Sequence, residues 1–299
     1  MKYVIMDLEW NGNRSPILGR HFNEIIEIGA VLLDESLNYV KDFSALITPK
    51  FNHRVSSRVK TLTHISDADL RYARELPEVI DHFTDWLGED DNCVVTFGTG
   101  DILVLLENFE VYGIESAMQF MKHYCDLQPL CAAAIETKFD FQLSLADTAG
   151  GLGIEFDELD QHRALDDSII SAECFAAAYS AETFSSFVYR ADEEFFRRVT
   201  FKNYSLTDTE NEAIEPPMLM SSCPVCGAYL KRTSAFRQKS SSIRAECFCG
   251  KCGKEYEVRL YFKMKYDGIS KRVNAEEKTA AETETTVTAA TATATATVT

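Results

Sequence analysis

The chain has 299 residues, of which 45% are hydrophobic and 11% aromatic, enough apolar material for one sizeable core and a small second domain. Its formal net charge of −17 argues against a protein that grips nucleic acid over its whole surface. Residues 217–274 nevertheless contain 12 basic and only 4 acidic residues, so positive charge is concentrated near the end of the chain. This asymmetry predicts two domains with different roles.

The expected elements follow one another as in an α/β domain. Strands over 2–8, about 25–33 and about 38–47 are rich in Val, Ile, Tyr and Leu. A helix runs from Pro77 to Gly88, a short strand covers 92–97, and a helix follows over 102–109. Two more helices are expected at 143–152 and 164–179. This order predicts an α/β fold with a mixed sheet.

The sequence divides into four segments. A first, larger domain is expected over 1–190 and a polar linker, which contains Pro216-Pro217, over 191–220. A second domain follows over 221–274, where hydrophobic and polar residues alternate along 256–264 as in a half-buried strand. The tail over 275–299 consists mainly of Thr, Ala, Glu and Val without aromatic residues, and we expect it to be disordered.

Cysteine usage and hydropathy predict a cytoplasmic protein without membrane association. The N-terminus enters an apolar strand without a basic leader region, and the apolar runs fall far short of the roughly 20 residues of a spanning helix. Four cysteines lie in apolar segments and are expected to be buried thiols. The other five lie within residues 223–252, which favours metal ligation in a reducing compartment over disulfides.

The first strand ends in Asp7-Leu8-Glu9. Residues two apart on a strand point to the same side, so both carboxylates are expected on one face at the edge of a core. Such a pair is costly unless a cation neutralises it, and its oxygen atoms suit Mg²⁺ or Mn²⁺. The alternative for an isolated Asp-x-Glu triplet is a solvated strand end.

Two later segments add acidic residues and a histidine. Asp101 follows the strand over 92–97, where it either caps the next helix or lines a site at the C-terminal edge of the sheet. In His162-Arg163-Ala164-Leu165-Asp166-Asp167, helical periodicity directs Asp167 toward the core side and Asp166 toward water. His162 must therefore precede the helix if it is to meet Asp167; a structural histidine is the alternative.

In this order, the motifs resemble the three exonuclease motifs of the DEDDh (DnaQ-like) superfamily. The resemblance rests on Asp7-Leu8-Glu9, the strand over 24–31, Phe97-Gly98-x-x-Asp101 and the run over 162–167, and it covers roughly residues 2–180. The strand over 24–31 and the run over 162–167 look most like the branch with the histone-mRNA/siRNA 3′ exonucleases and the bacterial KapD-like proteins. The resemblance implies a ribonuclease H-like fold, with a five-stranded mixed sheet flanked by helices.

The resemblance also implies a chemistry. Asp7, Glu9, Asp101 and Asp167 would hold two Mg²⁺ or Mn²⁺ ions, which favour an in-line displacement at phosphorus. His162 would act as the general base toward the attacking water, and Glu9 would also touch the terminal 3′-OH. The expected enzyme is a 3′→5′ exonuclease that hydrolyses single-stranded nucleic acid with a free 3′ end, RNA favoured over DNA, to nucleoside 5′-monophosphates.

Two positions depart from the family's pattern. Phe97 stands where relatives commonly have Trp, which preserves aromatic packing. His64 replaces a usual glycine in a segment that lies near the terminal nucleotide in relatives, so it affects substrate fit rather than metal chemistry. Leu8 and His64 are accordingly expected among the nucleic-acid contacts.

Cys223-Pro224-Val225-Cys226-Gly227 and Cys249-Gly250-Lys251-Cys252-Gly253 form two C-x-x-C-G knuckles. Four thiolates complete the tetrahedral coordination of one structural Zn²⁺ and leave no open position for catalysis. The spacing predicts a zinc ribbon, whereas a redox Cys-x-x-C fits poorly because two copies occur without a βαβ context. Cys247 is a spare thiol and an alternative ligand.

The predicted ribbon contacts either nucleic acid or protein. Its basic residues, with aromatic residues among them, suit phosphate contact and base stacking. Arg237, Lys239 and Arg244 are expected among these contacts. The alternative is a structural module that docks on the nuclease or on a protein partner.

Two other functions stay open. A regulatory nucleic-acid-binding protein could keep the exonuclease fold as a scaffold, although a scaffold has no physical need for four converging carboxylates. The second open function is a proofreading exonuclease of a DNA polymerase. Such a protein is expected to have a polymerase-binding C-terminal segment rather than a zinc ribbon.

Overall fold

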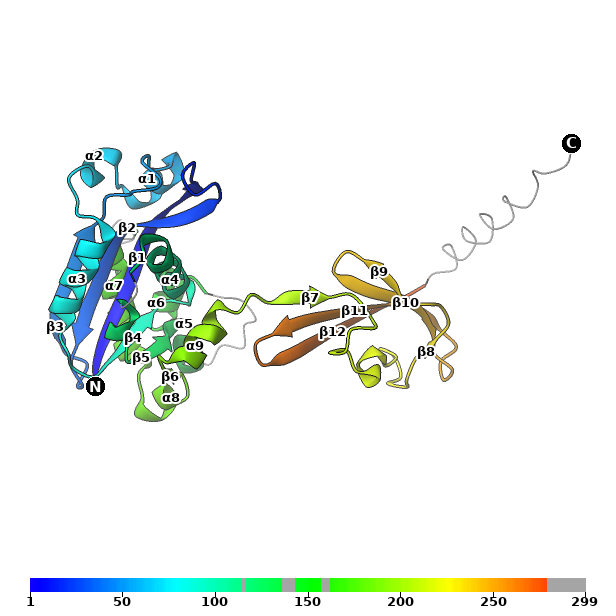
Figure 1. Ribbon diagram of the computed structural model, residues 1–299. Helices are drawn as coiled ribbons and strands as arrows, with labels where there is room; N and C mark the ends of the chain where they lie inside the picture. The colour runs from blue at the N-terminus through cyan, green and yellow to red at the C-terminus, as the bar shows by residue number, and fades with distance from the viewer. Residues whose placement is uncertain (115–116, 136–142, 157–161, 279–299) are drawn as a thin grey trace, which may run out of the picture. The chain divides into compact units, whose positions relative to one another are not determined.

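The computed structural model describes residues 1–114, 117–135, 143–156 and 162–278 (Figure 1). The chain divides into two compact units, Met1–Thr200 and Phe201–Thr299. The first unit packs hydrophobic side chains on both sides of one sheet, and the second has a smaller core of its own.

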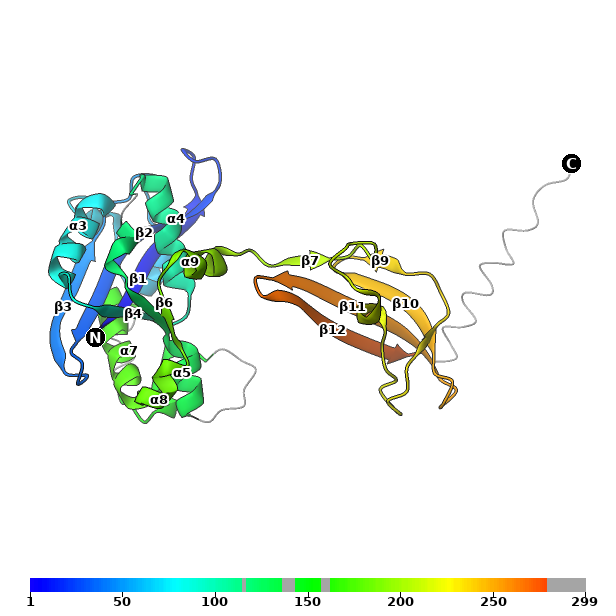
Figure 2. The ribbon, with the colours of Figure 1, turned by 60° about the horizontal axis from the view of Figure 1, so that its bottom comes forward.

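A mixed sheet of order β3-β2-β1-β4-β5-β6 forms the centre of the first unit (Figures 1 and 2). β2 is antiparallel to β1 and β3, β4 is parallel to β1 and β5, and β6 is antiparallel to β5. The strands span Lys2–Arg14 (β1), His21–Leu33 (β2), Tyr39–Leu46 (β3), Asn92–Thr96 (β4), His123–Asp126 (β5) and Val188–Arg190 (β6). The predicted fold class is confirmed, with six strands instead of five because the short β6 adds to the edge.

Helices cover both faces of this sheet (Figure 2). Val4 and Met6 of β1 pack on one side, and Tyr3 and Ile5 pack on the other. The first side carries α3 (Leu76–Leu87), α4 (Gly100–Tyr112) and α9 (Glu193–Thr200), and the second carries α5 (Leu127–Ala134), α6 (Leu145–Gly151), α7 (Ala164–Ala178) and α8 (Ala181–Ser185). Within the described residues, none of the helices is both long and apolar enough to cross a membrane.

Two short helices, α1 (Ser57–Thr63) and α2 (Asp67–Leu70), lie between β3 and α3. Ser56 caps α1, and Ser66 forms a reciprocal capping box with Asp69 on α2. The backbone N of Ser56 donates a hydrogen bond to the side-chain oxygen of Asn11 at 3.0 Å. This bond attaches the start of α1 to the far half of β1.

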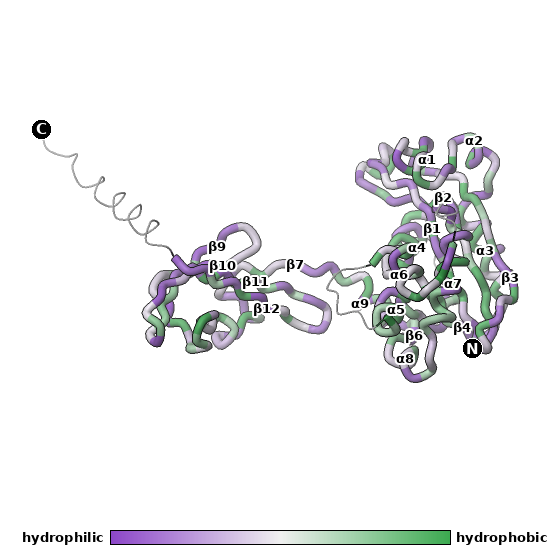
Figure 3. Tube along the Cα trace, turned by 180° about the vertical axis from the view of Figure 1, so that it is seen from behind, coloured by the Kyte–Doolittle hydropathy of each residue, from purple (hydrophilic) through white to green (hydrophobic). Residues whose placement is uncertain are grey.

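The second unit is an antiparallel sheet. It consists of β7 (Tyr204–Leu206), β8 (Lys231–Arg232), β9 (Arg237–Lys239), β10 (Ser242–Phe248), β11 (Glu255–Lys265) and β12 (Gly268–Glu277). β11 pairs with β12 on one side and with β10 and β7 on the other. Tyr256, Val258, Leu260 and Phe262 point into the core, as the alternation over 256–264 predicts. In Figure 3 the strands of this unit change between hydrophobic and hydrophilic colour along their length.

The segment boundaries differ from those expected. Residues 191–220, expected as a linker, contain α9 in the first unit and β7 in the second, with a 3-10 helix at Pro216–Leu219. α9 belongs to the first unit because Phe195 packs against Tyr124 in its core. The expected tail begins at residue 275, but β12 extends to Glu277, and residues 279–299 lie outside the described residues.

Candidate active site

Two carboxylates stand on the central strand β1. Ligand oxygens of Asp7, Glu9 and Asp167 lie within 4.8 Å of one another. A β-bulge follows at once, because Glu9 pairs with Glu27 whereas Trp10 pairs with Ile25. The extra residue on β2 bends the hairpin beside the two carboxylates. The cluster therefore lies at the point where the hairpin leaves the sheet.

A third carboxylate reaches the same place from α4. Asp101 lies in the first turn of this helix, just after β4, and only 5% of it is exposed. Its Oδ1 accepts a hydrogen bond from the backbone N of Leu8 at 3.1 Å. Because Leu8 lies between Asp7 and Glu9 in the chain, this bond holds Asp101 beside both of them.

The start of α7 supplies the fourth carboxylate and the histidine. Arg163 is the N-cap residue, so Asp167 falls in the first turn and His162 precedes the helix. His162 has a φ of 72°, a left-handed conformation that few residues other than glycine adopt. Asp167 and His162 line one cavity together with the other three carboxylates, whereas Asp166 does not line it.

Gly29 of β2 allows α7 to approach the sheet closely. A Cβ atom at this position would lie 2.1 Å from the carbonyl carbon of Ala164, so any side chain would push the helix away. The hydroxyl of Ser168 donates a hydrogen bond to the carbonyl oxygen of Gly29 at 3.0 Å. These contacts set the depth of the first turn of α7 and thereby the position of Asp167.

An ion pair that sequence reasoning missed anchors the same turn. The carboxylate of Glu27, which is only 1% exposed, accepts hydrogen bonds from both Nε and the NH2 group of Arg163, and from the backbone N of Ala164. Glu27 lies directly opposite Glu9, where two like charges repel each other. Arg163 supplies the compensating charge. A glutamate in an apolar strand was the available clue, since a buried carboxylate needs a partner.

Burial is the largest cause of raised pKa values in all four carboxyl groups. Desolvation, with repulsion from Asp167 and Glu27, raises the pKa of Glu9 to about 8. Desolvation raises the pKa of Asp101 to about 7 and, with the charges of Asp101 and Asp167, holds the pKa of Asp7 well above its usual range. Desolvation also raises the pKa of Asp167. Four ionised carboxylates are therefore unfavourable here without a cation.

This set of ligands fits hard divalent cations. The three carboxylates with metal-ligand spacing, Asp7, Glu9 and Asp167, offer only oxygen atoms, which Mg²⁺ and Mn²⁺ prefer, and Asp101 lines the same cavity beside them. A bound cation would offset both the desolvation and the mutual repulsion of the four groups. The cluster opens onto a cavity of about 760 Å³, so that a substrate and water can reach it. An open metal site of this kind suits catalysis rather than structural support.

The cavity continues from the carboxylates onto the far half of the β1–β2 hairpin and α1. Of the two nucleic-acid contacts expected in the first unit, Leu8 lines this cavity and His64 does not. His64 ends α1 in a left-handed conformation with φ 58°, and its side chain is exposed. Trp10 and Arg58 line the cavity and were missed, because only the fold brings α1 next to the hairpin.

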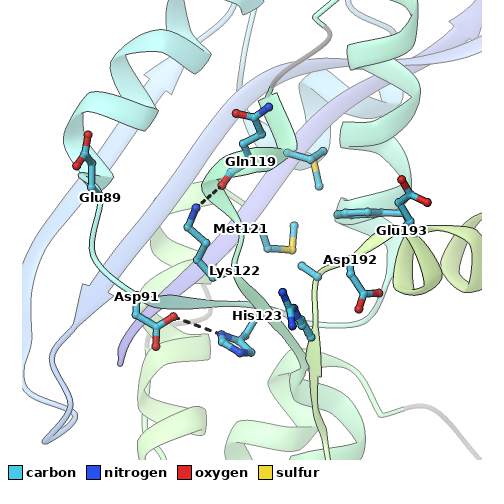
Figure 4. A pocket seen from close by; sticks show the side chains of 12 residues that line it. Glu89, Asp91, Gln119, Met121, Lys122, His123, Asp192 and Glu193 are labelled. Atoms are coloured by element: carbon cyan, nitrogen blue, oxygen red, sulfur yellow. Dashed lines mark hydrogen bonds and ion pairs between the residues drawn. The ribbon is translucent and has the colours of Figure 1, made fainter.

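A second cavity of the first unit, about 890 Å³ in volume, lies elsewhere on the fold (Figure 4). The side-chain Nδ1 of His123 lies 3.6 Å from Oδ1 of Asp91, and Lys122 donates a hydrogen bond to the carbonyl oxygen of Gln119 at 3.0 Å. None of the predicted site residues lines this cavity. Among the described residues, no cluster with metal-ligand geometry occurs in it.

The second unit brings four cysteines together. The Sγ–Sγ distance is 3.4 Å between Cys223 and Cys252, 3.5 Å between Cys226 and Cys249, and 3.6 Å between Cys226 and Cys252. Tetrahedral Zn–S bonds of about 2.3 Å require sulfur separations of about 3.8 Å, close to these values. Cys247 shares the core of this unit with Cys223 and Cys249, but it lies outside the group of four with metal-ligand spacing, so it is not an alternative ligand.

The four thiols influence one another's protonation. Desolvation opposes ionisation of Cys223, but hydrogen bonds from Tyr256 and from backbone amides lower its pKa to about 6. Hydrogen bonding with Cys249, followed by desolvation, raises the pKa of Cys252 to about 12. Without a cation, these contacts therefore favour ionisation of Cys223 and oppose that of Cys252. A zinc ion suits this site, because it can hold all four as thiolates.

Of the three basic contacts expected in the second unit, two face carboxylates. Arg244 NH1 lies 3.1 Å from Oε1 of Glu257, and Arg237 NH2 lies 3.8 Å from Oε1 of Glu246. Lys239 is exposed at the end of β9. The expected set is thus divided: Arg244 is engaged within the sheet, while Lys239 faces solvent.

Comparisons with known proteins agree with this geometry. The exonuclease family RNase_T matches residues 4–175, more than half of the chain. The PolC-type DNA polymerase III of Staphylococcus saprophyticus is 34% identical over 87 residues, which cover 29% of this chain and 6% of the polymerase. That of Streptococcus sanguinis is 27% identical over 117 residues, covering 39% of this chain and 7% of the polymerase. This chain thus matches only a small part of these relatives.

Solved structures resemble the first unit. The nuclease domain of 3′hExo, described as a DEDDh family member bound to rAMP, has a TM-score of 0.52 and 22% identity, and the match covers 58% of this chain and 90% of that one. A 3′-exonuclease described as recognising the histone mRNA stem-loop has a TM-score of 0.52 and 20% identity. That match covers 58% of this chain and 62% of the other. These likenesses establish the fold. Because the family matches most of the first unit and the predicted motifs lie within that match, the chain belongs to the RNase_T exonuclease family.

Proposed function

We propose that the protein is a metal-dependent 3′→5′ exonuclease that removes nucleoside 5′-monophosphates from single-stranded nucleic acid, with RNA favoured. The observation that carries this proposal is the convergence of Asp7, Glu9, Asp101 and Asp167 beside His162 in one open cavity. Their raised pKa values mean that such crowding is costly, so a protein that kept the fold only as a scaffold would gain nothing from it.

The four carboxylates would hold two Mg²⁺ or Mn²⁺ ions, which supply electrostatic stabilisation of the charged transition state of phosphodiester hydrolysis. His162, exposed on the loop before α7, accepts the proton of the attacking water. Glu9 accepts a hydrogen bond from the terminal 3′-OH, and Leu8 contacts the terminal nucleotide. Leu8 and Glu9 lie on one short stretch of β1 and line the same cavity as His162, which supports a scissile phosphate next to His162.

The second unit is proposed to be a zinc ribbon. Cys223, Cys226, Cys249 and Cys252 hold one structural Zn²⁺, which supports a sheet whose own core is small. All nine cysteines lie among the described residues and none forms a disulfide, which suits the proposed reducing cytoplasm. Catalysis is assigned to the first unit and a binding role to the second.

The preference for RNA has support from the solved neighbours, which are described with rAMP and with a histone mRNA stem-loop. The PolC-type relatives are DNA polymerases, and this observation makes proofreading of DNA the second candidate function. The two candidates share the same chemistry and differ in the sugar of the substrate.

The experiment compares wild type with Asp7→Asn on matched 5′-labelled single-stranded RNA, single-stranded DNA and duplex, with and without Mg²⁺ or Mn²⁺. Wild type is expected to shorten the single strands stepwise from the 3′ end, RNA fastest, only when the divalent ion is present. Asp7→Asn should be slower by roughly 10³-fold or more, because it removes a ligand of the ions.

Asp166→Asn is the matched control, since Asp166 is close to Asp167 in the chain but does not line the cavity. It is expected to trim at the wild-type rate. Immediate release of the labelled 5′ nucleotide, or equal rates for wild type and Asp7→Asn, would contradict the proposal. Faster trimming of DNA would favour the proofreading candidate.

A further inference from the structure

The sheet of the second unit has one face in the core and one facing away from it. Along β11, Val258 and Leu260 point inward, so Arg259, Tyr261 and Lys263 alternate onto the other face. Residues directly opposite one another in an antiparallel pair share a face. The register Tyr261↔Arg272 and Arg259↔Arg244 therefore extends this outer face across β12 and β10.

Near the cysteine knuckles, basic and acidic side chains of the outer face pair with one another. Arg244 and Arg259 both contact the carboxylate of Glu257, at 3.1 and 2.6 Å. Arg259 also lies 2.7 Å from Oε2 of Glu276. Carboxylates of the same sheet pair with these arginines and largely neutralise their positive charge. The arginines therefore attract a negatively charged partner only weakly.

The other end of the outer face, toward the β11–β12 turn, is basic. Its residues are Tyr261, Lys263, Lys265 and Arg272, which we call the basic end. The guanidinium of Arg272 lies over the ring of Tyr261 at 4.5 Å, and both lysines are exposed. Ion pairs of this unit involve its other basic residues, namely Arg237, Arg244, Lys254, Arg259 and Lys278.

We infer that the basic end binds the sugar–phosphate backbone and bases of a single-stranded nucleic acid, as a second contact apart from the site that takes the 3′ end. Lysines on a pleated strand suit successive phosphates, and the Tyr261–Arg272 stack offers a flat surface to a base. A protein partner fits less well, because interface cores are typically depleted of charged residues such as lysine. The inference rests on the proposed function only for the choice of nucleic acid as the substrate.

The test measures binding of labelled single-stranded RNA to the full chain carrying Asp167→Asn, across a range of salt concentrations. In that background, Tyr261→Ala should weaken binding roughly 5- to 100-fold through lost base stacking, whereas Tyr261→Phe should keep it. Lys263→Gln with Lys265→Gln should lower the slope of log affinity against log salt by about 1.4, since each lost phosphate contact contributes about 0.7.

Two variants serve as matched controls. Lys271→Gln removes one positive charge from the residue beside Arg272, but Lys271 pairs with Phe262 and belongs to the opposite face. Tyr229→Ala removes an aromatic ring that is 72% exposed elsewhere in the same unit. Both should bind RNA with nearly the wild-type affinity and salt slope. Zinc content, measured for every variant, should equal that of wild type.

Unchanged affinity and salt slope in Tyr261→Ala and in the double lysine variant would overturn the inference and leave protein docking as the role of this face. The outcome is separable from the proposed function, because trimming is measured with Asp167 intact. If the protein trims RNA but the basic-end variants bind RNA like wild type, only this inference is overturned. Binding through the basic end without any trimming overturns only the exonuclease proposal.

Discussion

The carboxylate cluster of the first unit and the cysteine cluster of the second face the same electrostatic problem. In each, four acidic groups converge although their mutual repulsion is unfavourable. The cysteines form a closed group, in which four of the sulfur–sulfur distances are 3.2 to 3.6 Å and all are within 4.8 Å. The carboxylates lie on the wall of a cavity of about 760 Å³.

The difference predicts that access separates a structural metal site in the second unit from a catalytic one in the first. A closed tetrahedron of thiolates leaves no position for a substrate, so its cation can only stabilise the fold. Open carboxylates leave coordination positions for water and a phosphate, and their cations can take part in a reaction. Removing a ligand should therefore unfold the protein locally in one unit and stop the chemistry in the other.

The largest expected effect is on the closed cluster. Cys223→Ser should lose zinc and unfold the second unit, because zinc binding contributes on the order of 10 kcal/mol to folding in such modules. The first unit should stay folded, and fluorescence reports it selectively because both tryptophans, Trp10 and Trp86, lie there. Cys247→Ser is the control, since Cys247 lies outside the cluster. Full zinc content in Cys223→Ser would break the comparison.

A smaller effect is expected from the residues that position the open cluster. Arg163→Lys keeps the positive charge but loses the two-pronged contact with Glu27, so the first turn of α7 should shift. We expect kcat to fall roughly 10- to 100-fold with little change in KM, and metal affinity to fall in parallel. Glu107→Gln, which breaks the exposed Arg20–Glu107 pair, is the control. Equal kcat values for Arg163→Lys and wild type would contradict a positioning role.

The smallest expected effect concerns stability without added Mg²⁺ or Mn²⁺. Glu9 ionises near pH 4.5 in the unfolded chain but only near pH 8 in the folded one, so the folded state holds the extra proton between these values. The free energy of unfolding of wild type, relative to that of Glu9→Gln, should therefore fall as pH rises through this window, by on the order of 1–3 kcal/mol. Urea unfolding followed by tryptophan fluorescence measures the difference. If the free energy of unfolding of wild type relative to Glu9→Gln rises with pH, or stays constant, the raised pKa of Glu9 is contradicted.

Local periodicity was sufficient to predict most elements of the first unit. The helix expected from Pro77 to Gly88 is α3, and the strand expected over 92–97 is β4. Likewise, Asp7 and Glu9 share a face because the strand period is two, and α7 begins after His162 as expected. These features depend on neighbours in the chain, which the sequence specifies directly.

Long-range pairing could not be read in the same way. β6 has three residues and exists only because β5 offers an edge. The Glu27–Arg163 pair joins residues 136 positions apart, and it depends on a close approach that Gly29 permits. In the second unit, charge alone suggested Arg244 as a nucleic-acid contact, but strand register places it opposite Arg259, and its guanidinium lies 3.1 Å from the carboxylate of Glu257.

The most direct measurement is the binding of Mn²⁺, followed by electron paramagnetic resonance, to zinc-loaded wild type and to Asp7→Asn at neutral pH. The account predicts that wild type binds Mn²⁺ and releases protons as carboxyl groups of the cluster ionise, and that Asp7→Asn binds it roughly 100-fold more weakly or not at all. Equal Mn²⁺ affinity in the two proteins, without proton release, would contradict the claim that divalent cations make the carboxylate cluster tolerable.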